Sequence, residues 1–409
     1  MRALSIHAGP RALAALREHG LRPHDVRVIP AAAGGPKGLV LNPLDRFIFG
    51  DWLATSGHTV HLIGASIGAW RMATACLSDP ALALAQMAHD YIHQDYEHRP
   101  GKAPAIQHVS DVFGAKLQQC FGGREAEVLG HPRFRLHVFT SRGLHLLRRE
   151  GRVRTPLGYL GAFAANAVSR RAMGGWLERV VFSDPREPLP LYLHGYRTRG
   201  VDLSAANLQL SLLASCSIPF LLSAVNDIPG APTGAYWDGG ITDYHLHLNY
   251  ASLHAEPPVE TAAVPGGGAG ASANASAGAG ASASAGAGAG AAAGASTGAG
   301  PGADVGAGLV LYPHFQRTVI PGWLDKSLKH CHRATAHLDN VVLLSPTPEW
   351  IASLPNAKLP DRQDFKHYGA DTPGRVAVWS SAVRESERLR DEFAAWLLRG
   401  DAGEVEPLS

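Results

Sequence analysis

Short hydrophobic runs rich in branched side chains alternate along this chain with stretches whose hydrophobic residues recur at helical spacing. Val26–Ile29, Val60–Ile63 and Phe134–Phe139 have the length and composition of buried strands. Leu208–Leu213 is a further strand candidate, although a helix fits its pattern equally well. Such alternation is typical of an α/β fold with a largely parallel sheet and helices on both faces. Functional residues of such sheets follow the carboxyl ends of the strands.

A low-complexity stretch interrupts this pattern. Between about residues 257 and 308 the chain is dominated by Gly, Ala and Ser, whose side chains bury too little apolar area to offset the entropy of ordering. Strand patterns return at Leu309–Tyr312 and Val341–Leu344, and Arg375–Leu398 has the pattern of a closing amphipathic helix. We therefore expect one domain over residues 22–400 with a flexible surface insertion that carries no chemistry, which loop-closure entropy permits.

Composition and charge narrow the range of partners. Of the 409 residues, 45% are hydrophobic, which is enough to bury a sizeable core. Lys and Arg total 37 against 35 acidic residues, so the chain has no large field that would hold nucleic acid. The most apolar helical candidate, Leu157–Leu177, contains Asn166, Arg170 and Arg171. We therefore expect a buried or cap helix there and no transmembrane segment.

The cysteines and the N-terminal residues indicate the cellular compartment. Four cysteines lie far apart without paired spacing, at Cys76, Cys120, Cys216 and Cys331. Met1–Gly20 carries charged residues and histidines in place of the apolar run of a secretory signal. We expect a reducing compartment and a cytoplasmic location.

A strand, a sharp turn and a helix meet around Ser66. The strand candidate Val60–Ile63 runs into Gly64-Ala65-Ser66-Ile67-Gly68, which has the form G-x-S-x-G, and a helical stretch follows. At such an elbow the central residue is strained and exposed, while Gly64 and Gly68 let the strand and the helix approach closely. The helix N-terminus stabilises a developing oxyanion. Ser66 is therefore the candidate nucleophile, although serine is also a common helix N-cap.

A glycine-rich turn after the first strand supplies candidate oxyanion donors. Its sequence is Ala33-Gly34-Gly35-Pro36-Lys37-Gly38. Backbone amides in such a turn can face a developing negative charge. Because proline has no N–H, we expect Gly34 and Gly35 to donate first, with Lys37 and Gly38 as lesser donors. A phosphate-binding loop is the competing interpretation, but neither of the common nucleotide-binding patterns is complete here.

Asp238 is the candidate base. It follows the hydrophobic residues Tyr236 and Trp237 and precedes Gly239 and Gly240. A surface turn is the simpler interpretation, since Asp-Gly is a common turn pair. A carboxylate with a usual pKa of about 3.9 is a weak base, so partial burial near Trp237 would help by raising that pKa. No histidine is then required.

Four ordered motifs together resemble the patatin-like phospholipases. They are the Gly-Gly-x-Lys-Gly loop at Gly34, G-x-S-x-G at Gly64, Ala214-Ser215-Cys216-Ser217-Ile218-Pro219 with its A-S-x-S-x-P form, and D-G-G at Asp238. They span roughly the first 60% of the chain. Two departures are Ala33, where the family's longer loop has glycine, and Thr242–His245, which lacks the Asn and Pro often found after D-G-G.

The resemblance implies a three-layer α/β/α fold with a mainly parallel central sheet. It also implies a Ser-Asp dyad that hydrolyses fatty acyl esters, with phospholipids or lysophospholipids as substrates. Ser66 would be the nucleophile, Asp238 the base, and the amides of Gly34 and Gly35 the oxyanion donors. The implied partners are a lipid or acyl ester and, transiently, a membrane surface. No cofactor or metal is implied.

An esterase of the ordinary α/β-hydrolase type is the main alternative. It would add an acid and then a histidine after the serine, an order that Asp238 followed by His245, His247 or His314 satisfies. The nucleophile of that fold normally follows several strands, whereas Ser66 follows the second strand candidate. A non-catalytic lipid-binding protein of the same scaffold is a third possibility, which loss of the serine or the aspartate would mark.

A metal site is the remaining alternative. Asp243, His245 and His247 would share one face if their segment were a strand, because strand side chains alternate. Together with His330-Cys331-His332 they would suggest a metallohydrolase. Polar residues on a half-exposed strand explain the same pattern, in a chain with 21 histidines.

Overall fold

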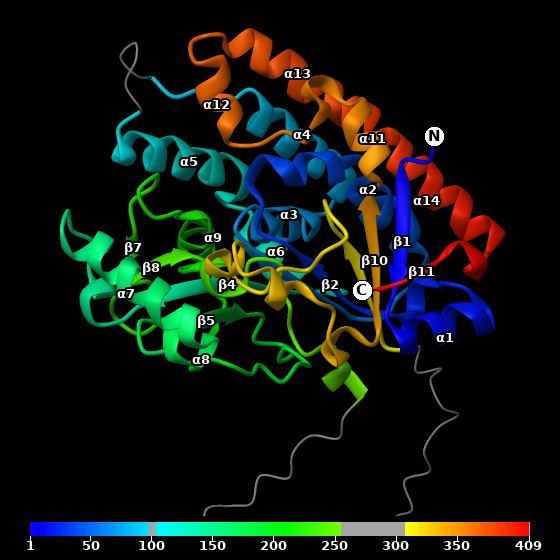
Figure 1. Ribbon diagram of the computed structural model, residues 1–409, viewed down its shortest axis with the longest axis horizontal. Coiled ribbons are helices and arrows are strands. Elements are labelled where there is room, and N and C mark those ends of the chain that lie inside the picture. Colours follow the sequence, from blue (N-terminus) through cyan, green and yellow to red (C-terminus); the bar gives the residue numbers. More distant parts are fainter. Residues whose placement is uncertain (98–103, 255–306, 409) are drawn as a thin grey trace, which may run out of the picture. The chain divides into compact units, whose positions relative to one another are not determined.

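The computed structural model describes residues 1–97, 104–254 and 307–408. The strands of this part of the chain form one mixed sheet in the order β11-β1-β10-β9-β2-β3-β4-β5-β6, with β8 paired to β4 and β7 to β8 (Figure 1). From β10 through β9, β2 and β3 to β4, neighbouring strands are parallel. β1 is antiparallel to β10, and β5 and β8 are antiparallel to β4. The expected three-layer α/β/α fold with a mainly parallel sheet is confirmed.

The strands are β1 (Leu4–Ala8), β2 (Val26–Ala31), β3 (Val60–Ala65), β4 (Phe134–Gly143), β5 (Leu177–Ser183), β6 (Thr198–Asp202), β7 (Val225–Asn226), β8 (Ala235–Asp238), β9 (Leu309–Pro313), β10 (Val341–Pro346) and β11 (Glu406–Pro407). The helices are α1 (Pro10–His19), α2 (Asn42–Phe47), α3 (Ile67–Ala75), α4 (Pro80–Ile92), α5 (Ile106–Phe121), α6 (Glu125–Gly130), α7 (Arg154–Val168), α8 (Arg170–Met173), α9 (Leu208–Cys216), α10 (Gly240–Asp243), α11 (Pro348–Ser353), α12 (Gln363–Tyr368), α13 (Thr372–Glu385) and α14 (Glu387–Arg399).

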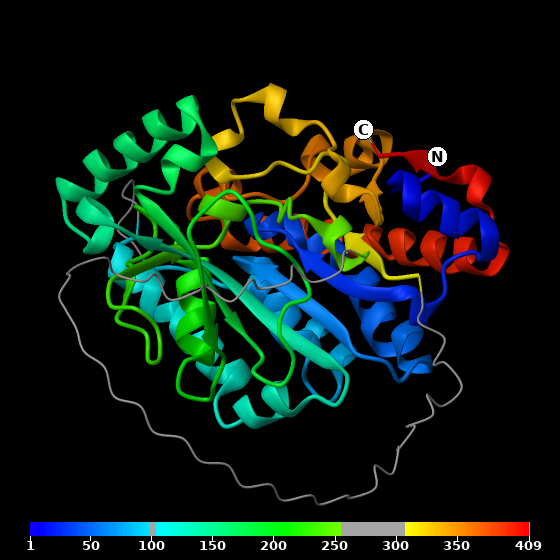
Figure 2. The same cartoon turned by 90° about the horizontal axis from the view of Figure 1, so that it is seen from below.

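Helices cover both faces of the sheet (Figure 2). On one face α3 packs on β3, and α9 packs on β4 and β8. On the other face α7 and α8 pack together beyond β5. The branched residues of the central strands are fully buried between these layers, as expected for strands covered on both sides. A second, smaller core cluster, which includes Tyr159, Met173 and Trp237, lies under α7.

Most of the expected strands are confirmed, and one strand candidate is a helix. Val26–Ile29, Val60–Ile63 and Phe134–Phe139 lie in β2, β3 and β4. Leu208–Leu213 instead begins the helix α9. Gln209 and Ser211 alternate with leucines in this segment, which is the spacing of a strand, and the helix is buried on most sides, so its pattern has no clear helical periodicity.

Three expected boundaries differ from those observed. The domain was expected to begin at residue 22, but Leu4–Ala8 forms β1 and pairs with β10. The single closing helix at Arg375–Leu398 is divided into α13 and α14 at Ser386. The helical candidate Leu157–Leu177 is α7 and α8, ending where β5 begins, and the outer face of α7 is exposed rather than buried.

The chain on both sides of the low-complexity stretch belongs to one sheet. Leu309–Tyr312 and Val341–Leu344 lie in β9 and β10, as expected, and these strands stand between β1 and β2. The proposed insertion itself falls almost entirely on residues 255–306, outside the described residues.

All four cysteines are free thiols. In the described part of the chain, no helix is both long enough and apolar enough to cross a membrane.

Candidate active site

The two candidate catalytic residues meet because β3 and β8 share one edge of β4. β3 runs parallel to β4 as far as the pair Ala65 and Phe139. β8 runs antiparallel to β4 and ends at the next position, where Asp238 pairs with Thr140. The carboxyl ends of β3 and β8 therefore point toward each other. Ser66 and Asp238 are 172 positions apart in sequence and adjacent in space.

The turn at Ser66 is strained and tightly packed. Ser66 has φ 57° and ψ −131°, a conformation that L-residues rarely adopt, and it lies directly before α3. A Cβ on Gly64 would lie 2.3 Å from Cα of Ala69, and one on Gly68 would lie 2.0 Å from the carbonyl oxygen of Ala31. Both glycines of the G-x-S-x-G pattern are thus required by close backbone approach, as expected for this kind of elbow.

A hydrogen bond joins the two candidate catalytic side chains. Oγ of Ser66 donates to Oδ2 of Asp238 over 2.6 Å, and both residues are about 5% exposed. The N–H of Gly240 donates to Oδ1 of Asp238 over 2.7 Å, which fixes the carboxylate and leaves Oδ2 facing the serine. No bridging residue separates the hydroxyl from the carboxylate.

The A-S-x-S-x-P segment is hydrogen-bonded to the backbone of both Ser66 and Asp238. Oγ of Ser215 accepts the N–H of Ser66 over 2.8 Å and donates to the carbonyl of Phe139 over 2.7 Å. The N–H of Asp238 donates to the carbonyl of Ser217 over 2.9 Å. The motif resemblance identified the segment, but its role in joining the nucleophile turn, β4 and the base emerges only in three dimensions.

The environment of Asp238 favours a proton-accepting role. Burial raises the pKa of Asp238 to about 6, against the opposing effects of the hydrogen bonds from Ser66 and Gly240. The cationic side chains of Arg362 and Lys326 also limit the rise. The carboxylate is consequently a stronger base than an exposed aspartate and is still ionised near neutral pH.

The glycines after Asp238 are also fixed by packing. A Cβ on Gly239 would lie 2.1 Å from the carbonyl oxygen of Phe139, and one on Gly240 would lie 2.6 Å from the Cβ of Ala33. The D-G-G motif therefore brings Asp238 under the glycine-rich loop at Ala33 as well as against β4.

The first part of the glycine-rich loop lies at the pocket. Gly34 and Gly35 line the pocket around Ser66. A Cβ on Gly34 would lie 2.4 Å from the ring of Phe315, and Gly35 has a φ of 57° that favours glycine. The short 3-10 helix Gly35–Leu41 begins here, so the amides of its first turn have no acceptor within the helix.

Lys37 and Gly38, the two lesser oxyanion candidates, lie behind the pocket wall. Nζ of Lys37 is 5.7 Å from the centre of the Phe315 ring, and burial lowers the pKa of this lysine. A Cβ on Gly38 would lie 3.4 Å from Ile67 of α3, so this glycine contributes to packing between loop and helix. Neither residue lines the pocket.

The histidines of the triad alternative lie elsewhere. Nδ1 of His245 accepts the N–H of Ile320 over 3.0 Å, and burial lowers the pKa of His245 well below its usual value. His314 bonds through Nδ1 to the carbonyl of Gln316, and His247 lies 3.4 Å from the hydroxyl of Thr335. Within the described residues no histidine is hydrogen-bonded to Ser66 or Asp238.

The residues of the metal alternative do not come together. Asp243 is the last residue of α10 and does not lie on a strand. It forms a buried, bidentate ion pair with Arg179. Nε2 of His332 is hydrogen-bonded to the carbonyl of Asp325. Over residues 1–97, 104–254 and 307–408, no three His, Cys, Asp or Glu side chains are grouped as metal ligands.

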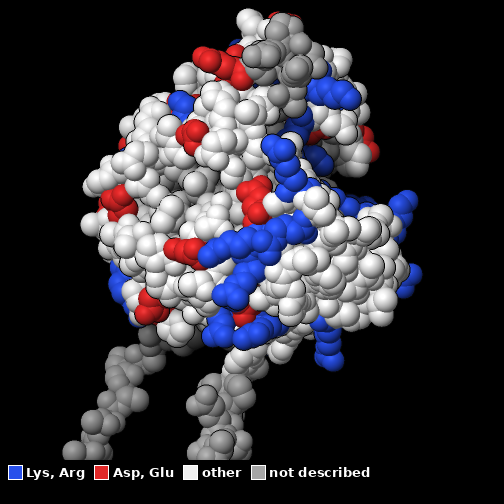
Figure 3. All heavy atoms as spheres, turned by 90° about the vertical axis from the view of Figure 1, so that its left-hand side faces the viewer, with Lys and Arg blue, Asp and Glu red and all other residues white. Residues whose placement is uncertain are grey.

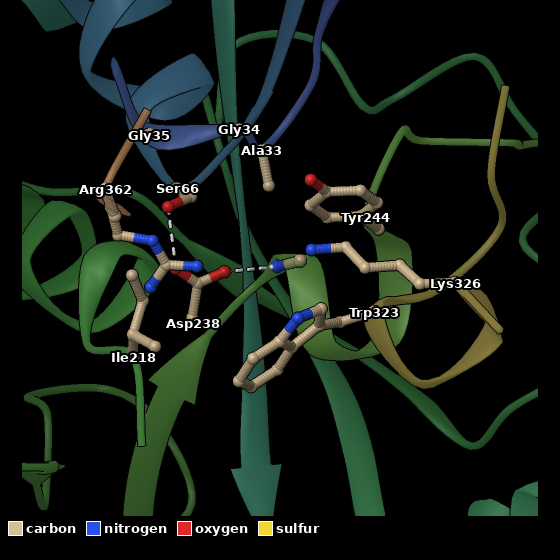
Figure 4. Close-up of a pocket in the computed structure, with 11 residues that line it drawn as sticks. Ala33, Gly34, Gly35, Ser66, Ile218, Asp238, Tyr244, Trp323, Lys326 and Arg362 are labelled. Carbon is tan, nitrogen blue, oxygen red and sulfur yellow. Dashed lines mark hydrogen bonds between the residues drawn. The ribbon is translucent and has the colours of Figure 1, made fainter. Parts of the chain in front are cut away.

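A small pocket opens above the two candidate catalytic residues (Figure 4). Its lining comprises Ala33, Gly34, Gly35, Ser66, Ile218, Asp238, Gly240, Tyr244, Trp323, Lys326 and Arg362. The wall is apolar on the side of Ile218 and Trp323, and Gly34 and Gly35 of the glycine-rich loop form another part of it. Lys326 and Arg362 reach toward the dyad from opposite sides.

Lys326 and Arg362 belong to no motif, and the sequence did not indicate them. Both are exposed at the mouth of the pocket. The ammonium of Lys326 lies 3.9 Å from the ring centre of Tyr244, and its partial burial, with repulsion from Arg362, lowers its pKa to about 8. Neither side chain lies within ion-pair distance of an acidic residue of the described ranges, although both interact electrostatically with Asp238.

Comparisons of the chain with protein-family models, with curated proteins and with solved structures find no match.

Proposed function

We propose that this protein is a serine lipid acyl hydrolase of the patatin-like class that acts through a Ser66–Asp238 dyad. The observation that carries the proposal is the 2.6 Å hydrogen bond from a serine on a strained elbow to a buried carboxylate with a raised pKa, inside a pocket. The ordered motifs from Gly34 to Gly240 support the class. In the described part of the chain, none of the three candidate histidines is hydrogen-bonded to Ser66 or Asp238.

The geometry supports an acyl-enzyme mechanism. Asp238 accepts the proton of the Ser66 hydroxyl as Oγ attacks the acyl carbonyl, and the proton then passes to the leaving alcohol. The N–H of Ser66 is already bound to Ser215, so it does not face the oxyanion. The amides of Gly34 and Gly35 and the first turn of α3 are the donors that this role leaves available. Water activated by Asp238 then releases the fatty acid.

The reaction class is tested by an ester panel. Purified protein is expected to hydrolyse p-nitrophenyl acyl esters, lysophospholipids or phospholipids, and to be labelled covalently by a fluorophosphonate. Free fatty acid and labelled protein are measured in parallel. If no ester is cleaved and no label is incorporated by folded protein, the proposal is wrong.

The two cations at the pocket mouth favour an ester that carries a phosphate group. Lys326 and Arg362 approach the dyad from both sides, and a phosphate within reach of both would gain charge-assisted hydrogen bonds. Because both side chains are exposed, solvent screening reduces the contribution of each. Phospholipids and lysophospholipids are therefore better candidates than neutral acylglycerols.

Replacing either cation is expected to affect KM for a phosphate-bearing ester. In Lys326→Gln and Arg362→Gln, KM for a lysophosphatidic acid should rise about threefold to tenfold, while KM for the matching monoacylglycerol changes less than about twofold. Arg17→Gln is the control, because it removes one positive charge from an exposed position of α1. Equal losses of kcat on both esters would instead indicate transition-state stabilisation by these cations.

The raised pKa of Asp238 leads to a prediction for the pH profile. Asp238 must be ionised to accept the serine proton, so kcat/KM on a neutral ester should be constant above about pH 7 and fall as the pH drops through about 6. Below that point each pH unit should cost about tenfold. Initial rates with a monoacylglycerol between pH 4 and pH 8 provide the measurement. A profile that stays flat down to pH 4 would contradict a buried carboxylate base.

A further inference from the structure

Helix α7 carries its largest hydrophobic side chains on its outer side. Its buried positions hold mainly small or polar residues, namely Thr155, Gly158, Tyr159, Ala162 and Asn166. Its outward positions are Leu157, Leu160, Phe163 and Val168, whose exposed fractions are 52%, 64%, 43% and 85%. Helices on soluble domains normally turn such side chains inward. We call these four outward residues the α7 face.

The apolar surface continues from the α7 face to the pocket. Tyr159, on the inner side of α7, contacts Phe220 with a ring distance of 5.9 Å. Phe220 and Leu221 are themselves about half exposed. They follow Ile218, which lines the pocket, on the same loop. Exposed hydrophobic patches that border a binding site are typical of contact surfaces rather than of ordinary solvent-exposed helices.

Arginines border this apolar surface. Between Leu146 and Arg171 the chain contains six arginines and one glutamate, a net charge of +5, whereas the whole chain has a net charge of +2. The six are Arg148, Arg149, Arg152, Arg154, Arg170 and Arg171. Four precede or begin α7 and two follow it, so they lie at both ends of the helix. Arg149 is paired with Asp227 and Arg170 with Asp325, whereas Arg148, Arg152, Arg154 and Arg171 form no ion pair with an acidic residue of the described ranges. The left-hand side of the molecule, where α7 lies, shows a broad area without charged side chains bordered by Lys and Arg (Figure 3).

We propose that the α7 face docks onto the surface of an anionic lipid membrane. The exposed Leu, Phe and Val side chains enter the boundary between headgroups and acyl chains, and the arginines that have no acidic partner, at both ends of the helix, contact lipid phosphates. An apolar centre with a basic border is complementary to such a membrane, because the centre can contact the hydrocarbon while the border contacts the phosphates at the membrane surface. Docking would bring the loop Ile218–Leu222, and with it the pocket mouth, to the lipid. The proposal concerns binding and does not depend on turnover.

Sedimentation with vesicles tests the apolar contacts. The full chain is expected to bind vesicles of phosphatidylcholine with about one third phosphatidylglycerol. Leu160→Glu and Phe163→Glu should each weaken this binding at least about tenfold, because they place a charge in the buried part of the interface. Leu398→Glu, on α14 with 90% exposure, is the matched control and should bind like the wild type. Unchanged melting temperatures check that the variants fold.

The basic border is tested separately. Arg152→Gln combined with Arg171→Gln should weaken binding to the anionic vesicles about tenfold, and binding of the wild type should fall between roughly 0.05 M and 0.5 M salt. Arg17→Gln should have no effect. Failure of the wild type to bind anionic vesicles, or equal binding by wild type and Leu160→Glu, overturns the proposal. So does a wild-type dimer that Leu160→Glu converts to a monomer, because a second copy would then cover the α7 face.

Discussion

Replacing Ser66 with alanine is expected to remove nearly all esterase activity, with a loss of turnover of about 10⁴-fold or more. The substitution deletes the oxygen that is proposed to form the acyl-enzyme, while this hydroxyl donates a hydrogen bond to Asp238. Covalent labelling by a fluorophosphonate should vanish in the same variant, and mass spectrometry of the wild type should place the adduct on the peptide that contains Ser66.

The thiol of Cys216 is a second nucleophilic group close to Ser66. Cys216 is buried next to the dyad, and burial raises the pKa of its thiol well above the usual value, so it should be unreactive at neutral pH. Cys216→Ala is therefore expected to retain labelling. Equal labelling of wild type and Ser66→Ala would remove Ser66 from the mechanism.

Replacing Asp238 with asparagine is expected to reduce turnover about 10³-fold or more, although the side chain keeps its shape. An amide cannot accept the serine proton, and its NH₂ group cannot accept the hydrogen bond that the carboxylate receives from Ser66 or Gly240. In contrast, His245→Gln, His247→Gln and His314→Gln should leave kcat within severalfold of the wild type. Rates are measured per mole of folded protein, as determined by circular dichroism.

The histidine series separates a dyad from a triad. His245 and His314 are fully buried, so circular dichroism and melting temperature accompany each rate. A folded histidine variant as impaired as Ser66→Ala would show that a histidine is the base. The protein would then be an α/β-hydrolase-type esterase rather than a patatin-like one.

The central strands and the dyad were predictable because their signals are local. β2, β3 and β4 are buried runs. The elbow at Ser66 is contained in the consecutive residues 60–75, with glycines at the two positions where a Cβ would collide with backbone. Asp238 could be chosen because two glycines follow it. That Asp238 lies against Ser66 depended on the meeting of β3 and β8 on β4, which no local pattern contains.

The outer half of the pocket was not predictable. Lys326 and Arg362 are single cations in irregular segments, and they reach the dyad only through the path of the chain after β9. The α7 segment was expected to be a buried or cap helix because its composition is apolar apart from Asn166, Arg170 and Arg171. Composition cannot show that its small residues face the protein while its large residues face outward.

The position of β9 has a consequence for how the chain folds during synthesis. β2 carries the glycine-rich loop at its end, and its two neighbours in the sheet are β3 and β9. A ribosome that has made every motif residue through Gly240 has still not made Leu309, so one edge of β2 lacks its partner. Open parallel edges invite pairing with other chains, and contacts between distant residues form slowly. The sheet of the nascent chain therefore stays incomplete after all the candidate catalytic residues have been made, until β9 and β10 emerge.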